Sequence, residues 1–325
     1  MNKLDVPKLW TSQINEAVKT AQQNSEGAYS TDQSYEELRA AYCQERVFWN
    51  EGGPEMERTV NTVIPTRHGE IPVRLYFPTA TARVQPQPLI VFTHGGGWVL
   101  GNPDTHDRMT RILAKESGAV LASVDYTLAP EAKYPQPVEE TVDVIRFLQA
   151  NAQQWNLCST DISLAGDSGG AHIALASYFM LRDAGVDVSG IRSLLLFYGW
   201  YGLQDSASAR LMGGWWDGLT REDFQYYKNL AIAGEHEYGK PYIDLLSNDM
   251  AQAMPPAYVM AAELDPLIDD SKALVAMLEA NNKLVKFDVV PGVIHAFLHY
   301  SKMVDAATEA LAHAARFQRR HTATK

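Results

Sequence analysis

The sequence has little cysteine, no long apolar run and no cluster of basic residues. It contains 2 cysteines, Cys43 and Cys158, which excludes a disulfide framework and a thiolate metal site. Its most apolar stretches, such as Leu194–Phe197, are too short to cross a bilayer. The first residues, MNKLDVPKLWTSQ, have neither the apolar core nor the cleavage site of a secretory signal. These features predict a cytoplasmic protein without a membrane partner.

Positive charge is also scarce. The 325 residues include 39 acidic side chains against 28 Lys and Arg, a net charge of −11. A nucleic-acid partner is therefore not expected, because binding to a phosphate backbone depends on basic side chains. An apolar fraction of 46% and a charged fraction of 21% are typical of a globular chain that can bury a large core.

Apolar, β-rich runs alternate with helical patterns along most of the chain. This alternation predicts an α/β fold in which helices cover both faces of an eight-stranded, mostly parallel sheet. The first two strands are separated by the turn RHGE, which predicts an antiparallel hairpin at one edge. The expected strands are Thr59–Pro65, Ile71–Phe77, Leu89–Thr93, Ala119–Asp125, Ile162–Ala165, Ser193–Tyr198, Ala257–Ala261 and Val285–Val290.

Two segments do not follow the alternation. Residues 1–50 have a helical pattern that includes a capping box, Ser34 with Glu37. Residues 200–250 form an aromatic-rich crossover that is longer than a connection needs. We therefore expect a single domain, 1–325, with a helical cap made from residues 1–50 and a second insertion from residues 200–250.

The strongest chemical motif is G-x-S-x-G at residues 166–170, directly after one expected strand and directly before a helix. Such a turn exposes a serine hydroxyl above the end of a sheet, and glycines permit the crowded backbone. Ser168 is therefore the candidate nucleophile. The alternative is a glycine-rich turn in which Ser168 only caps the helix.

A second motif, His94-Gly95-Gly96-Gly97-Trp98, follows the strand Leu89–Thr93. Backbone N–H groups in such a loop can stabilise the oxyanion that forms during acyl transfer. The expected donors are Gly96, Gly97 and Gly169, with His94 holding the loop by hydrogen bonding. A flexible glycine loop is the alternative, whereas phosphate binding is disfavoured because neither common phosphate-loop motif is present.

A nucleophilic serine needs a base, and the base needs an orienting acid. Two later loops supply candidates at the carboxyl ends of expected strands. The first loop offers Asp265, with Glu263 and Asp269 as rivals, and the second offers His295, with His299 as its rival. We favour Asp265 and His295.

These motifs, HGGGW, DYTLAPE, GDSGG, DPLIDD and GVIHAF, resemble in order and spacing the hormone-sensitive-lipase-like (GDXG) family of α/β hydrolases. The resemblance extends over nearly the whole chain. It implies a cytoplasmic carboxylesterase for short acyl esters, with a helical cap, and it maps the triad onto Ser168, Asp265 and His295. It also implies that a homodimer or regulatory protein partners are worth testing. The family usually has alanine after the nucleophile, where this chain has Gly169.

The expected function is therefore a serine esterase acting on small esters, acetyl to butyryl, with no metal or organic cofactor. The rivals are a lipase or amidase that uses the same residues and a non-catalytic binding protein. The aromatic residues of the second insertion have two interpretations, either the core of the cap or the wall of an acyl pocket. The candidates for that wall are Trp215, Trp216 and Phe297.

Overall fold

One twisted sheet organises the computed structural model, which describes residues 4–24, 30–79 and 85–322. Its eight strands lie in the order β1-β2-β4-β3-β5-β6-β7-β8. The strands are β1 (Arg58–Thr66), β2 (Gly69–Phe77), β3 (Gln87–Thr93), β4 (Val120–Val124), β5 (Leu157–Asp167), β6 (Ile191–Phe197), β7 (Ala257–Leu264) and β8 (Val285–Ile294).

Six of the strands run parallel, from β4 to β8, and the hairpin β1–β2 lies antiparallel at one edge. The predicted α/β sheet and its edge hairpin are thus confirmed. Strand β4 is buried at every position, as its continuous apolar sequence indicates. The expected strand near Val285 continues through Pro291 and Gly292 to Ile294, which is compatible with its place at the edge because proline is tolerated there.

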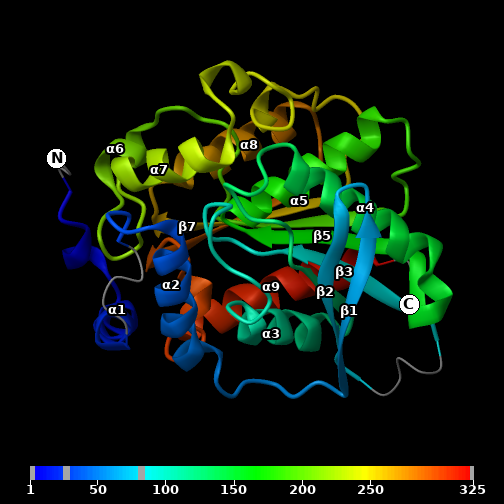
Figure 1. The fold of residues 1–325 in the computed structure, drawn as a ribbon, viewed down its shortest axis with the longest axis horizontal. Helices are drawn as coiled ribbons and strands as arrows, with labels where there is room; N and C mark the ends of the chain where they lie inside the picture. Colours follow the sequence, from blue (N-terminus) through cyan, green and yellow to red (C-terminus); the bar gives the residue numbers. More distant parts are fainter. Residues whose placement is uncertain (1–3, 25–29, 80–84, 323–325) are drawn as a thin grey trace.

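Helices cover both faces of the sheet (Figure 1). On one face lie α3 (Asp107–Ser117) and α9 (Asp305–His321), and on the other lie α4 (Gln136–Ala150), α5 (Gly169–Asp183) and α8 (Ile268–Ala280). Two clusters of buried apolar side chains fill the spaces between sheet and helices. The apolar stripe of α3 accounts for its position, and Gly118 ends this helix in the left-handed conformation, with φ 71°.

The remaining helices gather at one end of the sheet (Figure 1). They are α1 (Ser12–Asn24), α2 (Tyr35–Asn50), α6 (Ala207–Leu211) and α7 (Arg221–Ala231). The predicted capping box at the start of α2 is confirmed: the Glu37 N–H donates to Ser34 Oγ, and the Ser34 N–H donates to the Glu37 carboxylate. Helix α7 begins with a second capping box, Thr220 with Asp223.

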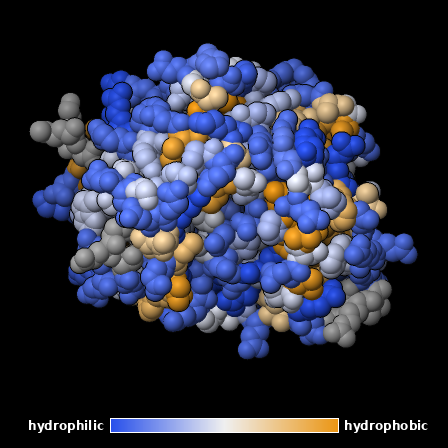
Figure 2. All heavy atoms as spheres, in the orientation of Figure 1, coloured by the Kyte–Doolittle hydropathy of each residue, from blue (hydrophilic) through white to orange (hydrophobic). Residues whose placement is uncertain are grey.

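The face of the molecule seen in Figure 2 is mainly hydrophilic, with apolar residues in small, separate patches. No helix among residues 4–24, 30–79 and 85–322 combines the length and the apolar character needed to span a membrane.

Candidate active site

Ser168 lies at a sharp turn between β5 and α5, with φ 52° and ψ −123°. Residues other than glycine rarely adopt this backbone conformation, and it persists only where the surrounding structure enforces it. The flanking glycines are required by close packing: a Cβ at Gly166 would lie 2.4 Å from the Gly170 carbonyl oxygen, and one at Gly170 would lie 2.0 Å from the Thr93 carbonyl oxygen. The G-x-S-x-G sequence thus forms the strained turn that exposes Ser168 at the end of the sheet.

Ser168, His295 and Asp265 form a continuous chain of hydrogen bonds. His295 Nε2 lies 2.9 Å from Ser168 Oγ, and His295 Nδ1 lies 2.8 Å from Asp265 Oδ2. All three side chains are buried, with exposed fractions of 8%, 4% and 0% for Ser168, His295 and Asp265. Ser168 follows β5, His295 follows β8 and Asp265 follows β7. Because these strands are parallel, all three loops lie at the carboxyl ends of the strands, on the same side of the sheet.

The two rival acids have other partners. Glu263 accepts a hydrogen bond from the Gly292 N–H at 2.7 Å, and Asp269 accepts one from the Ser208 N–H at 2.9 Å. Asp265 Oδ1 accepts from the Leu267 N–H at 2.7 Å, which leaves Oδ2 to face His295. The rival base, His299, points to Asp167 Oδ2 at 4.0 Å. Among these candidates, only Asp265 and His295 are joined to Ser168.

The electrostatics of His295 favour proton transfer. Burial alone would lower the pKa of His295, but the charge of Asp265 and its hydrogen bond outweigh burial, so that this pKa is raised above its ordinary value. The negative charges of Asp217 and Asp167 act in the same direction. The site thus stabilises the imidazolium that forms when His295 accepts a proton.

The glycine loop after β3 is held by buried polar groups. The Gly95 N–H donates to Asp167 Oδ1 at 2.8 Å, and the His94 ring contacts the Gly95 carbonyl through Nδ1 at 2.9 Å. The Tyr126 hydroxyl donates to the His94 carbonyl at 2.8 Å. Burial lowers the pKa of His94 to about 3, so this ring is neutral near pH 7. The contacts of His94 are those expected of a residue that fixes the loop.

The N–H groups of Gly96, Gly97 and Gly169 face no acceptor within the part of the chain that the structure describes. Gly96 and Gly97 have φ values of 116° and 58° and border the cavity above Ser168. A Cβ at Gly97 would lie 2.7 Å from the Tyr227 ring. Gly96 and Gly97 thus border the cavity with N–H groups that no described acceptor engages, whereas Gly169 does not line it.

Trp98 occupies the space beside Gly169. Its indole N–H donates to the Gly169 carbonyl at 3.1 Å, and a Cβ at Gly169 would lie 3.1 Å from the same nitrogen. Alanine at this position would require the buried indole to move by a few tenths of an ångström. Gly169, which stands where the family usually has alanine, thus lies against a tightly packed tryptophan.

The cavity above Ser168 is small, with about 40 Å³ of volume. Its wall combines the glycine loop with side chains from α2, α7, the segment before α7, the end of the glycine loop and the segment after β8: Tyr42, Arg46, Leu100, Asp217, Leu219, Tyr227 and His299. Tyr227 belongs to the aromatic residues of the second insertion that were considered for this wall, and the other six residues were not predicted. Most of the six lie far from Ser168 in the sequence, which explains why a local pattern did not reveal them.

The three predicted wall residues lie elsewhere. Trp215 is 54% exposed, Trp216 packs edge-on against Trp10 at 5.5 Å, and Phe297 is fully buried against Tyr198. Trp216 and Phe297 belong to the apolar core beneath the site. Of the aromatic residues of the second insertion, Trp216 thus packs in the core, whereas Tyr227 borders the cavity.

Asp217 is the most unusual residue of this wall. Its Oδ1 accepts hydrogen bonds from the N–H groups of Gly214 and Leu219, whereas its buried Oδ2 has no partner among the described residues. Burial raises the pKa of Asp217 to about 7. A carboxylate that titrates near neutral pH therefore faces the cavity beside His295.

One group of side chains could offer ligand atoms to a metal. Ligand atoms of His106, Asp167 and His299 lie within 4.8 Å of one another, and all three side chains are buried. Asp167 Oδ1 already accepts the Gly95 N–H and lies 3.4 Å from His106 Nε2. These contacts give Asp167 a structural role in joining the serine turn to the glycine loop.

Comparison with known proteins identifies the family. A family model described as "alpha/beta hydrolase fold" matches residues 90–299. The chain belongs to the α/β-hydrolase family. It is 43% identical over 301 residues to an acetyl esterase of Salmonella paratyphi B, covering 93% of this chain and 92% of that protein. The predicted resemblance is thus confirmed.

Solved structures of esterases share the fold of this α/β hydrolase. A hyperthermophilic esterase from the archaeon Pyrobaculum calidifontis superposes with a TM-score of 0.89 at 27% identity, covering 96% of this chain and 98% of that one. The thermostable carboxylesterase EstE1, from a metagenomic library, gives 0.85 at 28% identity, covering 90% and 99%. The chain is a carboxylic ester hydrolase.

Proposed function

We propose that this hydrolase is a serine esterase for short acyl groups, acetyl to butyryl, with Ser168 as nucleophile, His295 as base and Asp265 as orienting acid. The observation that carries the proposal is the hydrogen-bond chain from Ser168 Oγ through His295 to Asp265. The acetyl esterase name of the Salmonella relative supports the short acyl range.

In the first half of the reaction, Ser168 Oγ attacks the ester carbonyl while His295 Nε2 takes the hydroxyl proton. The imidazolium is stabilised by Asp265, which accepts the Nδ1 proton in a hydrogen bond. As the tetrahedral intermediate collapses, the bond between the carbonyl carbon and the alcohol oxygen breaks. His295 gives its proton to that oxygen, so the alcohol leaves and the acyl group stays on Ser168.

In the second half, water replaces the alcohol. His295 takes a proton from the water as its oxygen attacks the acyl carbon, and it returns the proton to Ser168 Oγ as the carboxylic acid departs. The oxyanion formed in each half accepts hydrogen bonds from the N–H groups of Gly96, Gly97 and Gly169. Such preorganised donors stabilise the transition state more than the substrate, since negative charge on this oxygen develops only there.

Labelling with diethyl 4-nitrophenyl phosphate tests this proposal directly. The reagent should modify Ser168 alone, located by mass spectrometry of peptides, and activity should fall in proportion to the label. An adduct on a different serine, or complete labelling of Ser168 without loss of activity, would contradict the assigned nucleophile.

The size of the cavity predicts a sharp limit on acyl length. We expect kcat/KM on nitrophenyl esters to be highest from acetyl to butyryl and to fall steeply by octanoyl. Each added methylene gains about 0.8 kcal/mol when buried, whereas overfilling a packed site costs roughly 1–3 kcal/mol. A rate series from two to twelve acyl carbons measures this limit. An optimum at eight carbons or more would favour the lipase alternative.

Leu219 is the wall residue to change, because it borders both the catalytic cavity and a neighbouring pocket. Leu219→Ala should join the two spaces and move the optimum to longer acyl groups. Trp215→Ala is the matched control, since this side chain is 54% exposed and does not border the cavity. An equal change of acyl preference in both variants would argue against Leu219 as the limiting wall.

Asp217 should influence the pH dependence of the reaction. Its carboxylate contributes to the raised pKa of His295, so Asp217→Asn should lower that pKa and move the acidic limb of the kcat/KM profile to lower pH. Asp249→Asn, which changes an exposed carboxylate bonded to the Ala251 N–H, serves as control and should leave the limb in place. A shift to higher pH in Asp217→Asn would contradict this electrostatic role.

The remaining assignments are proposals of the same kind. We propose that residues 1–50 and 200–250 act as a cap over the site, supported by the wall residues that α2 and α7 contribute. A cytoplasmic location is a prediction that cell fractionation can test. A homodimer and regulatory protein partners stay predictions from the family resemblance.

A further inference from the structure

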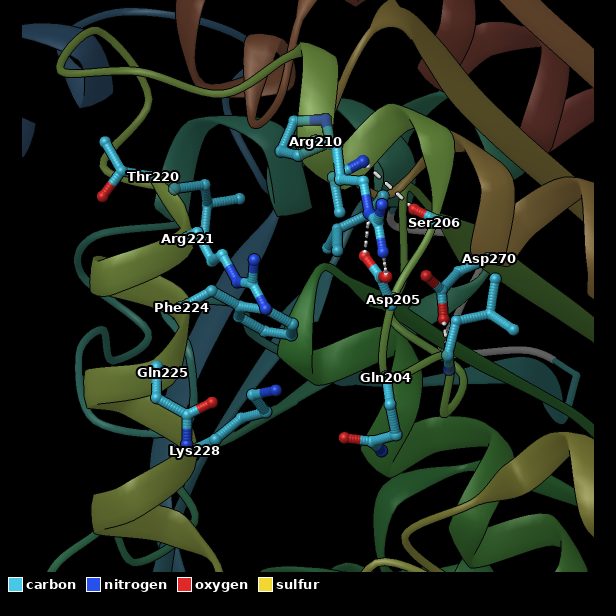
Figure 3. Close-up of a pocket in the computed structure, with 15 residues that line it drawn as sticks. Gln204, Asp205, Ser206, Arg210, Thr220, Arg221, Phe224, Gln225, Lys228 and Asp270 are labelled. Carbon is cyan, nitrogen blue, oxygen red and sulfur yellow. Dashed lines mark hydrogen bonds and ion pairs between the residues drawn. The ribbon is translucent and has the colours of Figure 1, made fainter. Parts of the chain in front are cut away.

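A second pocket lies beside the catalytic cavity, between α7 and the loop at residues 203–206 (Figure 3). Its volume is about 80 Å³, twice that of the cavity above Ser168. In the close-up, Arg221, Phe224 and Lys228 extend from α7 into the pocket, and Gln204 and Asp205 lie on the opposite side. Leu219 borders both spaces. The reaction proposed above uses no other residue of this pocket.

Lys228 is the unusual group of the pocket. The residue is only 6% exposed, yet its ammonium meets no hydrogen-bond acceptor or carboxylate partner within residues 4–24, 30–79 and 85–322. Its nearest described neighbours are the rings of Phe224 and Tyr238, whose centroids lie 4.9 and 5.5 Å from Nζ. Burial, assisted by the charge of Arg221, lowers the pKa of Lys228. Because the residue is largely buried and no acceptor is bonded to its ammonium among the described residues, Lys228 is available to an anion that enters the pocket.

Arg221 adds a second positive charge on the same face of α7, seven residues before Lys228. The carboxylates of the pocket attract the two cations through space, the charge of Asp270 acting on Lys228 and that of Asp205 on Arg221, but their direct partners are other groups. Asp205 is paired with Arg210, and Asp270 Oδ1 accepts hydrogen bonds from the N–H groups of Tyr201 and Leu203. The pocket therefore presents two cations that form no direct ion pair with any residue the structure describes, although the chain as a whole carries a charge of −11.

The rest of the lining is mixed: Gln204, Ser206, Thr220 and Gln225 are polar, and an apolar part is formed by Leu203, Leu219, Phe224, Pro266 and Leu267. We propose that this pocket binds a small organic carboxylate, with its charged group between Lys228 and Arg221 and its apolar body against Phe224 and Leu219. Apolar walls with a few convergent charged groups are typical of small-molecule sites. This pocket is a binding site separate from the catalytic centre, and the proposal does not depend on the esterase mechanism.

Binding of hexanoate, measured by calorimetry, tests the proposal. The catalytic cavity is first blocked with diethyl 4-nitrophenyl phosphate, so that hexanoate cannot bind there as a product. Hexanoate should bind the blocked enzyme, and Lys228→Met should weaken that binding at least about tenfold, because one partner of a buried charge pair is lost. Lys240→Met, at an exposed lysine paired with Glu237, is the matched control and should bind as the parent does.

Two further probes define the ligand class. Hexan-1-ol, which has the same apolar body but no charge, should bind more weakly than hexanoate and equally to the parent and to Lys228→Met. Inorganic phosphate should bind more weakly than hexanoate. Tighter binding of phosphate, or equal affinity of hexanoate for the parent and Lys228→Met, would overturn the assignment.

Thermal unfolding gives an independent measurement. Without ligand, Lys228→Met should raise Tm, since an unpaired buried charge is replaced by an apolar side chain of similar length. Hexanoate should raise the Tm of the parent and not that of the variant, because a ligand stabilises only the state that binds it. A lower Tm in Lys228→Met, with the hexanoate effect retained, would show a structural lysine and refute the site.

Discussion

Ser168→Ala should lower kcat for ester hydrolysis by about a millionfold, as expected when the nucleophile of a triad is removed. The loss is large because the oxyanion donors and the binding cavity, which remain, supply only a small part of the rate enhancement. The fold should persist, since alanine removes one oxygen and leaves the turn between β5 and α5 intact. Steady-state kinetics and circular dichroism of the same preparation measure both effects.

The matched control is Ser189→Ala, at an exposed serine distant in sequence from the turn. It should retain the parent kcat. A Ser168→Ala enzyme that keeps a substantial fraction of the activity would show that another group performs the attack.

His295→Ala should have an effect close to that of Ser168→Ala, and Asp265→Asn should lower kcat by about ten-thousandfold. The acid is less critical than the base because it orients the imidazole and stabilises its charge without exchanging a proton with the substrate. Glu263→Gln, at the end of β7, and Asp269→Asn, at the start of α8, are neighbouring controls, and their effects on kcat should be far smaller. If either control were more damaging than Asp265→Asn, the assigned acid would be wrong.

The pH profile gives a second test of the base. Because Asp265 raises the pKa of His295, kcat/KM should fall as the pH drops through a value above the ordinary pKa of histidine, where the ring becomes protonated and cannot accept the serine proton. Removing the charge in Asp265→Asn should move this limb to lower pH in the residual activity. An unchanged acidic limb would mean that a different group controls it.

The sequence was sufficient to predict the sheet and the position of the nucleophile. Strands buried on both faces need continuous apolar residues, and this requirement is local enough to be seen in the sequence. The glycines around Ser168 form a contiguous motif that is visible in the sequence; Gly166 relieves a contact within the turn, Gly170 one with the end of β3 and Gly169 one with Trp98. The position of each motif directly after an expected strand then placed all the catalytic candidates at the carboxyl ends of the strands.

The sequence favoured Asp265 among three neighbouring acids, and the tertiary structure shows why the other two do not reach the base. Asp265, Glu263 and Asp269 lie within seven residues, and nothing in their spacing states which one faces His295. The extension of β8 to Ile294 brings the Gly292 N–H to Glu263, and α6 brings the Ser208 N–H to Asp269. Contacts from distant segments thus engage the two rivals and leave Asp265 for the base.

The cavity wall and the second pocket were decided by tertiary structure alone. The sequence by itself determined the fold, the turn that carries Ser168 and the position of the glycine loop, because each depends on residues that are close together in the chain. It did not determine that Tyr42, Leu219 and Tyr227 would enclose Ser168 while Trp216 and Phe297 packed into the core. A cavity forms where side chains from distant segments fail to fill the space between them, and that depends on how α2, α6 and α7 pack over the end of the sheet.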